Sequence, residues 1–343
     1  MKKVFTLFFE NIKSTFDWRL YSAVIVLLAA MIGFNYSPLF ERTFEKDWLR
    51  SFGEFSLSIN YIMSNPFEWI ISVFTSQIAV FFVSMYLPYV TVCGFIHLFT
   101  KQKEFFQKKG FWWSSIVIIG IIAFYRGAWF EEYAYDLHGA NNRYILTYNY
   151  KLIENIENLA TAIFPLFFLY LFYDRKRIEH FYGLQTKGVE IKPYLWMLLI
   201  MTVLIGVASL TSSFQATYPK VESSYYVQYA SFSGYNSWQT LVLFEFIYLL
   251  GFISVELLFR GALIYSIEKY LGEYVILPMA VIYCVLHFGK PMGETISSFG
   301  GGYVLGVLAL KTKNIYGGIF IHIGIALLME VCAFIAKHYN IVL

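Results

Sequence analysis

The stretch Ser254-Val255-Glu256-Leu257-Leu258-Phe259-Arg260-Gly261 places a carboxylate and a guanidinium inside an otherwise apolar helical segment. Two later apolar stretches each carry a histidine: residues 283–289 contain His287, and residues 319–324 contain His322. An ionisable side chain at membrane depth is costly, so it needs a partner and marks a candidate functional site. We therefore expect the rest of the chain to be arranged around these ionisable residues.

The spacing of these residues lets them meet between helices. Glu256 and Arg260 are four residues apart, so they lie on one face of a helix and can pair. Gly272 indicates a turn, with Glu256 16 residues before it and His287 15 residues after it. At about 1.5 Å per residue, two antiparallel helices leaving this turn bring Glu256 and His287 to about the same depth.

In order and spacing, the three stretches resemble the motifs of the CPBP or Abi family of membrane proteins. This family includes the CAAX prenyl endopeptidases and bacteriocin-processing enzymes. Its motifs Glu-Glu-x-x-x-Arg, Phe-x-x-x-His and His-x-x-x-Asn/Asp read here Val255-Glu256-x-x-x-Arg260, Tyr283-x-x-x-His287 and His322-x-x-x-Ala326. A Gly-rich segment at 301–306 and a basic turn at 311–316 extend the resemblance, which covers about residues 190–338.

The resemblance implies a catalytic role for Glu256, Arg260, His287 and His322. Glu256 would orient or activate water, and Arg260 would hold Glu256 in place. The two histidines would stabilise the oxyanion or shuttle the proton. The reaction implied is cleavage of a peptide bond near the membrane face.

Two positions depart from the family motifs. Val255 stands where the family has the glutamate thought to activate water, and Ala326 stands where it has an Asn or Asp. Valine cannot take a proton, and the alanine side chain cannot form a hydrogen bond. Glu294, which follows His287 in the segment 289–294, is the candidate substitute for the missing base.

A metal site receives weak support from the sequence. Two histidines and one glutamate match the ligands of hydrolytic zinc sites. These residues are scattered, and the chain has no HExxH helix, so zinc is possible but not favoured. The cysteines Cys93, Cys284 and Cys332 lie in apolar segments without a pairing pattern, which predicts small buried side chains.

Composition predicts an all-α, polytopic helical membrane protein. The 343 residues are 58% hydrophobic, 21% aromatic and 14% charged. Apolar runs near the length of a bilayer predict about nine spans: 20–36, 67–99, 112–130, 159–173, 194–210, 240–271, 275–288, 295–310 and 315–336. Residues 1–190 then form an N-terminal membrane region, with an amphipathic lead and about four spans. Residues 191–343 form a CPBP/Abi-like core with five spans.

The distribution of lysine and arginine predicts the orientation. The N-terminal lead, the segments 101–109 and 174–192, the turn near Lys269 and the turn at 311–313 are basic. The predicted loops 131–157, 214–238 and 289–294 carry few basic residues. We therefore expect an integral protein of the bacterial cytoplasmic (inner) membrane with its N-terminus in the cytoplasm. The net charge of only +3 argues against nucleic-acid binding.

Two functions follow from these observations, and both place the protein in a lipid bilayer. The first is an intramembrane endopeptidase acting on a protein substrate. The second is a non-catalytic scaffold, a pseudoenzyme that binds and positions a partner protein. The roughly 190 residues before the core, more than the family fold requires, favour the scaffold. The Tyr- and Trp-rich loop 214–238 could be its docking surface.

Overall fold

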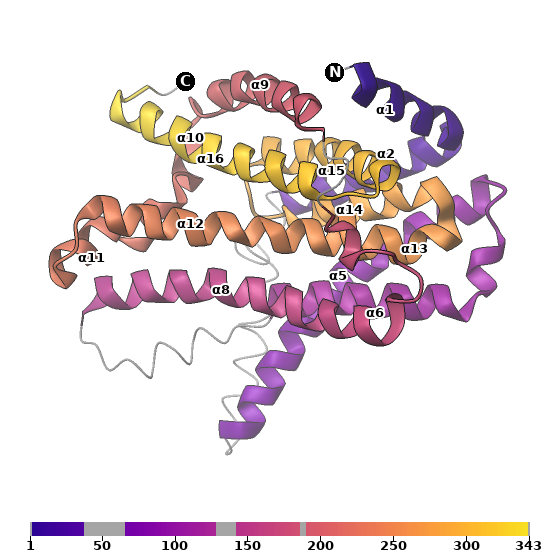
Figure 1. The fold of residues 1–343 in the computed structure, drawn as a ribbon, viewed down its shortest axis with the longest axis horizontal. Coiled ribbons are helices and arrows are strands. Elements are labelled where there is room, and N and C mark those ends of the chain that lie inside the picture. The colour runs from indigo at the N-terminus through magenta and orange to yellow at the C-terminus, as the bar shows by residue number, and fades with distance from the viewer. Residues whose placement is uncertain (1, 38–65, 128–141, 186–189, 342–343) are drawn as a thin grey trace.

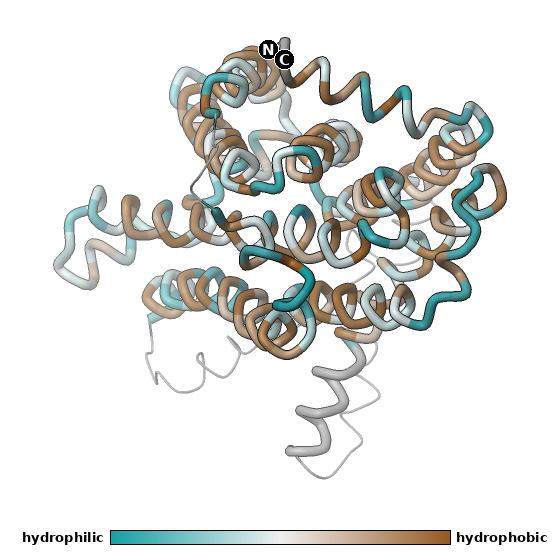
Figure 2. The backbone as a smooth tube through the Cα atoms, turned by 45° about the vertical axis from the view of Figure 1, so that its right-hand side comes forward, coloured by the Kyte–Doolittle hydropathy of each residue, from teal (hydrophilic) through white to brown (hydrophobic). Residues whose placement is uncertain are grey.

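The chain folds into a bundle in which all regular structure within the described residues is helical (Figure 1). The computed structural model describes residues 2–37, 66–127, 142–185 and 190–341. Figure 2 shows hydrophobic stretches along most of the long helices and hydrophilic stretches concentrated in the connections between them. The predicted all-α membrane fold is confirmed.

The region before residue 190 supplies the outer helices of the bundle. These are α1 (Lys2–Thr15), α2 (Trp18–Asn35), α5 (Pro66–Phe99), η1 (Glu104–Gln107), α6 (Lys109–Gly127), α8 (Arg143–Leu169), the π-helical turn η2 (Tyr170–Asp174) and η3 (Phe181–Gly183). Asp17 caps α2 by accepting hydrogen bonds from the backbone N–H groups of Arg19 and Leu20. Helix α5 continues through Pro88.

The region after residue 190 begins with a helix at the edge of the bundle and includes the helix at its centre, α14. Its elements are α9 (Ile191–Ala208), α10 (Ser212–Thr217), η4 (Lys220–Ser224), α11 (Tyr226–Ser233), α12 (Ser237–Glu256), the π-helical η5 (Leu257–Leu263), α13 (Ile264–Leu271), η6 (Gly272–Val275), α14 (Ile276–Leu286), α15 (Met292–Thr312) and α16 (Tyr316–His338). Gly272 ends α13 with a positive φ of 56°, a conformation that glycine adopts readily. The predicted turn at this residue is therefore present.

Seven segments of the described residues are long and apolar enough to cross a membrane. They are Trp18–Asn35, Gln77–Phe99, Lys109–Gly127, Arg143–Asp174, Ile191–Ala208, Ser237–Leu286 and Tyr316–His338. The sequence predicted about nine spans, and two features account for the difference. Two predicted spans, 240–271 and 275–288, overlap the single segment Ser237–Leu286, which turns back on itself at Gly272. The glycine- and serine-containing α15, predicted as a further span, is outside the seven.

Two predicted loops contain helices. α8 begins at Arg143, inside the predicted loop 131–157, and the Asn142 side chain caps it by accepting the N–H of Tyr144. The loop 214–238 holds most of α10 and all of η4 and α11. Both segments contain too many polar residues to form the apolar runs from which membrane spans are predicted. Residues 128–130 of a predicted span, 131–141 of the first loop and 186–189 of the basic segment lie outside the described residues.

The short helix α14 lies at the centre of the molecule. Every residue from Ile276 to Val285 is buried, and α14 packs against α15 on one side and α5 on another. The main hydrophobic core contains residues from before and after position 190, such as Tyr89, Ile119 and Leu258. The N-terminal helices therefore cover the helices that carry the candidate site.

Candidate functional site

Glu256 and Arg260 form the predicted ion pair at the point where α12 becomes the π-helical η5. Arg260 Nη1 lies 3.0 Å from Glu256 Oε1, and both side chains are 0% exposed. π-helical turns within longer helices occur frequently at functional sites. In the hydrocarbon interior a charged pair is tolerated because each partner neutralises the other.

His322 on α16 is the second partner of the Glu256 carboxylate. His322 Nδ1 lies 3.1 Å from Glu256 Oε1, and its Nε2 lies 3.2 Å from the Tyr283 hydroxyl. An ionised carboxylate can only accept hydrogen bonds, so the proton of the neutral imidazole is on Nδ1. Nε2 then carries a lone pair, which accepts from the Tyr283 hydroxyl.

His287 is held in the same tautomer by a different partner. It caps the C-terminus of α14, and its Nδ1 lies 2.9 Å from the backbone carbonyl oxygen of Tyr283. A carbonyl oxygen only accepts, so His287 also has its proton on Nδ1 and a lone pair on Nε2. Thr295 fixes the backbone here by donating its hydroxyl to the carbonyl of His287 at 2.7 Å.

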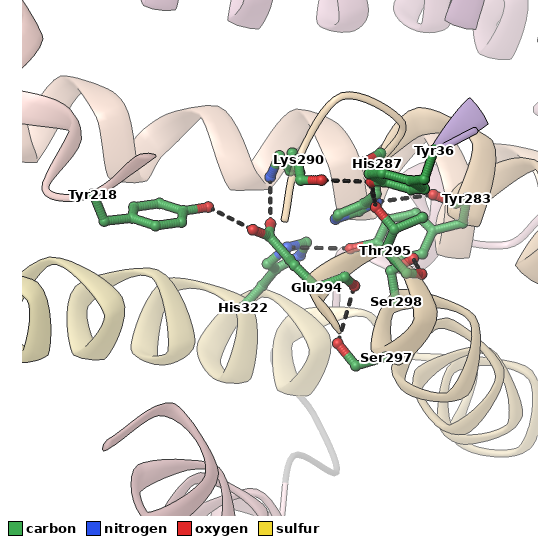
Figure 3. A network of polar contacts seen from close by, with 10 residues as sticks. All are labelled: Tyr36, Tyr218, Tyr283, His287, Lys290, Glu294, Thr295, Ser297, Ser298 and His322. Carbon is green, nitrogen blue, oxygen red and sulfur yellow. Dashed lines mark hydrogen bonds and ion pairs between the residues drawn. The ribbon is translucent and has the colours of Figure 1, made fainter. Parts of the chain in front are cut away.

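Tyr283 connects the two histidines and Arg260, a role that the sequence did not reveal. Its ring packs edge-on to the His287 ring at 4.7 Å, and the Arg260 guanidinium lies over the same ring at 4.0 Å. Figure 3 shows the hydrogen bond between the Tyr283 hydroxyl and His322 Nε2. The sequence held one indication of this role. Tyr283 begins the Tyr283-x-x-x-His287 motif, and its aromatic ring carries a hydroxyl group.

Gly318 is a second residue whose role the sequence did not reveal. A β-carbon at this position of α16 would lie 3.0 Å from Glu256 Cδ and closer still to Oε2. Glycine therefore lets α16 approach α12 closely enough for His322 to reach the carboxylate. The signal in the sequence was the Gly317-Gly318 pair four residues before His322.

Glu294 lies in the first turn of α15, in a neighbouring part of the polar network (Figure 3). Its carboxylate accepts hydrogen bonds from Lys290 Nζ at 2.7 Å and from the Tyr218 hydroxyl at 2.9 Å. No hydrogen bond or ion pair joins Glu294 to Glu256 or to either histidine within the described residues. The geometry thus gives the candidate substitute base a lysine and a tyrosine as partners.

The two departures from the family motifs remain apolar and buried. Val255 and Ala326 both lie in the interior of the protein and contribute no polar atom to the site. Glu256 Oε2 accepts no hydrogen bond from the described side chains, and the Arg260 nitrogens have no hydrogen bond of regular geometry. These buried atoms retain hydrogen-bonding capacity beside the histidines.

The described residues contain no group of three His, Cys, Asp or Glu side chains able to hold a metal ion. Glu256 already contacts Arg260 and His322, so its carboxylate serves an ion pair and a hydrogen bond. The residues of the site therefore do not fit a zinc ion, and its chemistry has to be derived from the side chains themselves.

Comparison with known proteins covers the part of the chain that carries the site. Residues 236–328 match the family model described as Type II CAAX prenyl endopeptidase Rce1-like, a narrower range than the 190–338 expected. The match includes Glu256, Arg260, His287 and His322. No curated protein and no solved structure matches the chain. The part of this membrane protein that carries the site is therefore similar to the Rce1-like type II CAAX prenyl endopeptidases.

Proposed function

We propose that the protein is an intramembrane endopeptidase in which histidine, not the missing glutamate, is the base. The observation that carries this proposal is the protonation pattern of His322 and His287. Acceptor-only partners hold the proton on Nδ1 of each ring, so each Nε2 keeps the lone pair that a base needs; on His322 this lone pair accepts the Tyr283 hydroxyl until it takes a proton. A neutral histidine that is oriented by a carboxylate is a common general base in hydrolysis.

His322 is better suited than His287 to take the proton. Its Nδ1–H donates to the Glu256 carboxylate, which stabilises the imidazolium formed when Nε2 accepts a proton. His287 donates to a neutral carbonyl and receives no such charge stabilisation. We therefore assign the base to His322 and the positioning of water to His287.

The reaction follows from these assignments. His322 Nε2 removes a proton from water, and the water oxygen attacks the carbonyl carbon of the scissile peptide bond. Protonation of Nε2 releases the Tyr283 hydroxyl, which then donates to the oxyanion. The tetrahedral intermediate collapses when the C–N bond breaks, and the leaving nitrogen takes the proton from Nε2. Arg260 holds the Glu256 carboxylate in place throughout.

The proposal also assigns the two regions of the chain and the orientation of the protein in the membrane. We take residues 191–343 as the catalytic core and residues 1–190 as an N-terminal membrane region. We place the N-terminus on the cytoplasmic side of the bacterial cytoplasmic membrane, because basic residues mark that side. Figure 1 supports this orientation, since α1 and the turn between α13 and α14 lie toward the same end of the bundle.

The test compares the N-termini of membrane proteins in bacteria producing wild-type protein or His322→Ala at equal abundance. Free α-amines are labelled and identified by mass spectrometry. We expect a set of new N-termini with the wild type that is lost with His322→Ala and kept with Glu268→Gln, a control on α13. Identical N-termini in all three strains would contradict the proposal.

A non-catalytic scaffold is the second candidate, and Val255 and Ala326 favour it. The two apolar residues are buried where the family resemblance places a base and an Asn or Asp. The Glu256–Arg260 pair would then serve only to fix helix packing. In that case one membrane protein should co-purify in mild detergent with wild type and with His322→Ala in equal amounts, without any cleavage.

A further inference from the structure

Three ionisable side chains lie at one depth between α8, α12 and α16. Lys151 follows the first residue of α8 by eight residues, and Glu245 follows the first residue of α12 by eight. Glu330 precedes the last residue of α16 by eight. These three helix ends lie at the same end of the bundle (Figure 1), so each side chain lies about 12 Å inside it.

A second group of charges continues from this depth towards the histidines. Glu330 accepts the backbone N–H of Lys220 at 2.8 Å, which ties η4 to α16. Tyr218, two residues before Lys220, donates to Glu294, and Glu294 pairs with Lys290 at 2.7 Å. Figure 3 shows that this network reaches from Tyr218 to His287.

The lysine of η4 lies close to the members of both groups. Burial lowers the pKa of Lys220, and the Lys290 ammonium lowers it further. The carboxylates of Glu294 and Glu330 act in the opposite direction, and Lys151 is near enough to contribute. Glu245 and Glu330 also interact with each other. The six charged residues of the two groups thus form one continuous row through this part of the bundle.

Towards the opposite end of the bundle, packing around Gly306 is apolar, and the buried Asp174 carboxylate is already engaged by the hydroxyls of Tyr182 and Ser266. Met279, Ile276 and Ile264 surround Gly306 of α15, and all three are fully buried. Gly261 of η5 packs directly against Tyr182, leaving no space for a β-carbon. Charged side chains within a membrane protein line aqueous paths, whereas tightly packed aliphatic side chains exclude water.

We propose that water and the polar part of a peptide substrate reach His287 and His322 from the end of the bundle where α8 and α12 begin. This route is lined by the row of charged residues Lys151, Glu245, Glu330, Lys220, Glu294 and Lys290. The inference rests on the proposed function for the nature of the substrate. Cleavage would then occur in segments of the substrate on the side of the membrane that holds α11. This is the side opposite the basic turns.

Thiol labelling tests this route without requiring activity. Cys93, Cys284 and Cys332 are first replaced by serine, and Lys290→Cys is added to that protein. Intact cells and inverted vesicles are treated with a membrane-impermeant sulfonated maleimide. Ser231→Cys on α11 and Gln102→Cys before η1 mark the two membrane faces, since both residues are exposed. Val203→Cys, in the candidate membrane span α9 and 66% exposed on the protein surface, is the unreactive control.

We expect Lys290→Cys to react on the face where Ser231→Cys reacts and to be protected on the face where Gln102→Cys reacts. Reaction only on the Gln102 face, or on neither face, would overturn the route. Glu245→Cys replaces Lys290→Cys if the latter does not fold. Repeating the labelling in His322→Ala separates the two proposals, because access to the thiol does not depend on cleavage.

Discussion

At the scale of single residues, the site depends on one carboxylate oxygen with two partners. Glu256 Oε1 contacts Arg260 Nη1 at 3.0 Å and His322 Nδ1 at 3.1 Å. The first contact balances the charge of the carboxylate, and the second fixes the tautomer of His322, the base that we propose. A structural and a chemical role therefore meet in one residue, and suitable substitutions can separate them.

Loss of Arg260 should reveal the structural role. Arg260→Ala leaves the buried Glu256 carboxylate without its cation, which should reduce stability by about 3–5 kcal/mol. Thermal unfolding in mild detergent measures the effect. Lys108→Ala is the matched control, because its i,i+4 partner Glu104 is exposed and such pairs contribute little. Equal melting temperatures for Arg260→Ala and wild type would mean that the pair is solvated.

Loss of the Tyr283 hydroxyl should reveal the chemical role. Tyr283→Phe keeps the ring beneath Arg260 and beside His287 but removes the hydrogen bond to His322 Nε2. Stability should fall by about 0.5–1.5 kcal/mol, the usual contribution of one hydrogen bond. The cleavage rate should fall by about a hundredfold, since the oxyanion loses its donor. A rate equal to that of wild type would remove Tyr283 from the mechanism.

At the scale of helices, glycine positions determine how closely the elements of the site approach. A β-carbon at Gly261 would lie 2.8 Å from the backbone oxygen of Tyr182 and 2.9 Å from its Cβ. Neither atom belongs to the end of a flexible side chain, so η5 would have to move away from η3. The same movement would shift Arg260, the preceding residue.

Gly261→Ala should therefore destabilise the protein by about 1–3 kcal/mol. The control is Gly251→Ala in α12, where a β-carbon meets no atom within 4 Å. Alanine should stabilise that helix slightly, because glycine is the weaker helix former. Melting temperatures of the two variants in detergent should move in opposite directions. A Gly261→Ala protein that melts with or above wild type would contradict the packing described for η5.

The sequence predicted the local parts of this arrangement and missed those that depend on tertiary packing. The Glu256–Arg260 pair followed from helical periodicity, and the turn at Gly272 followed from glycine chemistry. The contact between Glu256 and His322 joins residues 66 positions apart and depends on the close approach of α16 at Gly318. Helix periodicity could not reveal this contact, nor could hydropathy detect the polar first half of α8.

At the scale of the whole molecule, the N-terminal helices share one hydrophobic core with the family-like region. Tyr89 and Ile119 from before residue 190 lie in the same buried cluster as Leu258 and Ile276. Helix α14, which presents Tyr283 and His287, packs against α5 from the N-terminal region. Residues 236–328, which match the family model, are therefore packed inside a larger bundle, and the N-terminal helices surround them.

The central claim is that Glu256 and His322 act together as the base, and one kinetic measurement tests it most directly. Purified wild type, Glu256→Gln and Glu268→Gln are reconstituted in liposomes, and each cleaves a substrate identified from the wild-type N-termini. Glutamine can still accept from His322 Nδ1 but cannot stabilise the imidazolium, so kcat for Glu256→Gln should fall at least about a hundredfold. Glu268→Gln should keep the wild-type rate. A Glu256→Gln protein that folds and cleaves at the wild-type rate would contradict the account.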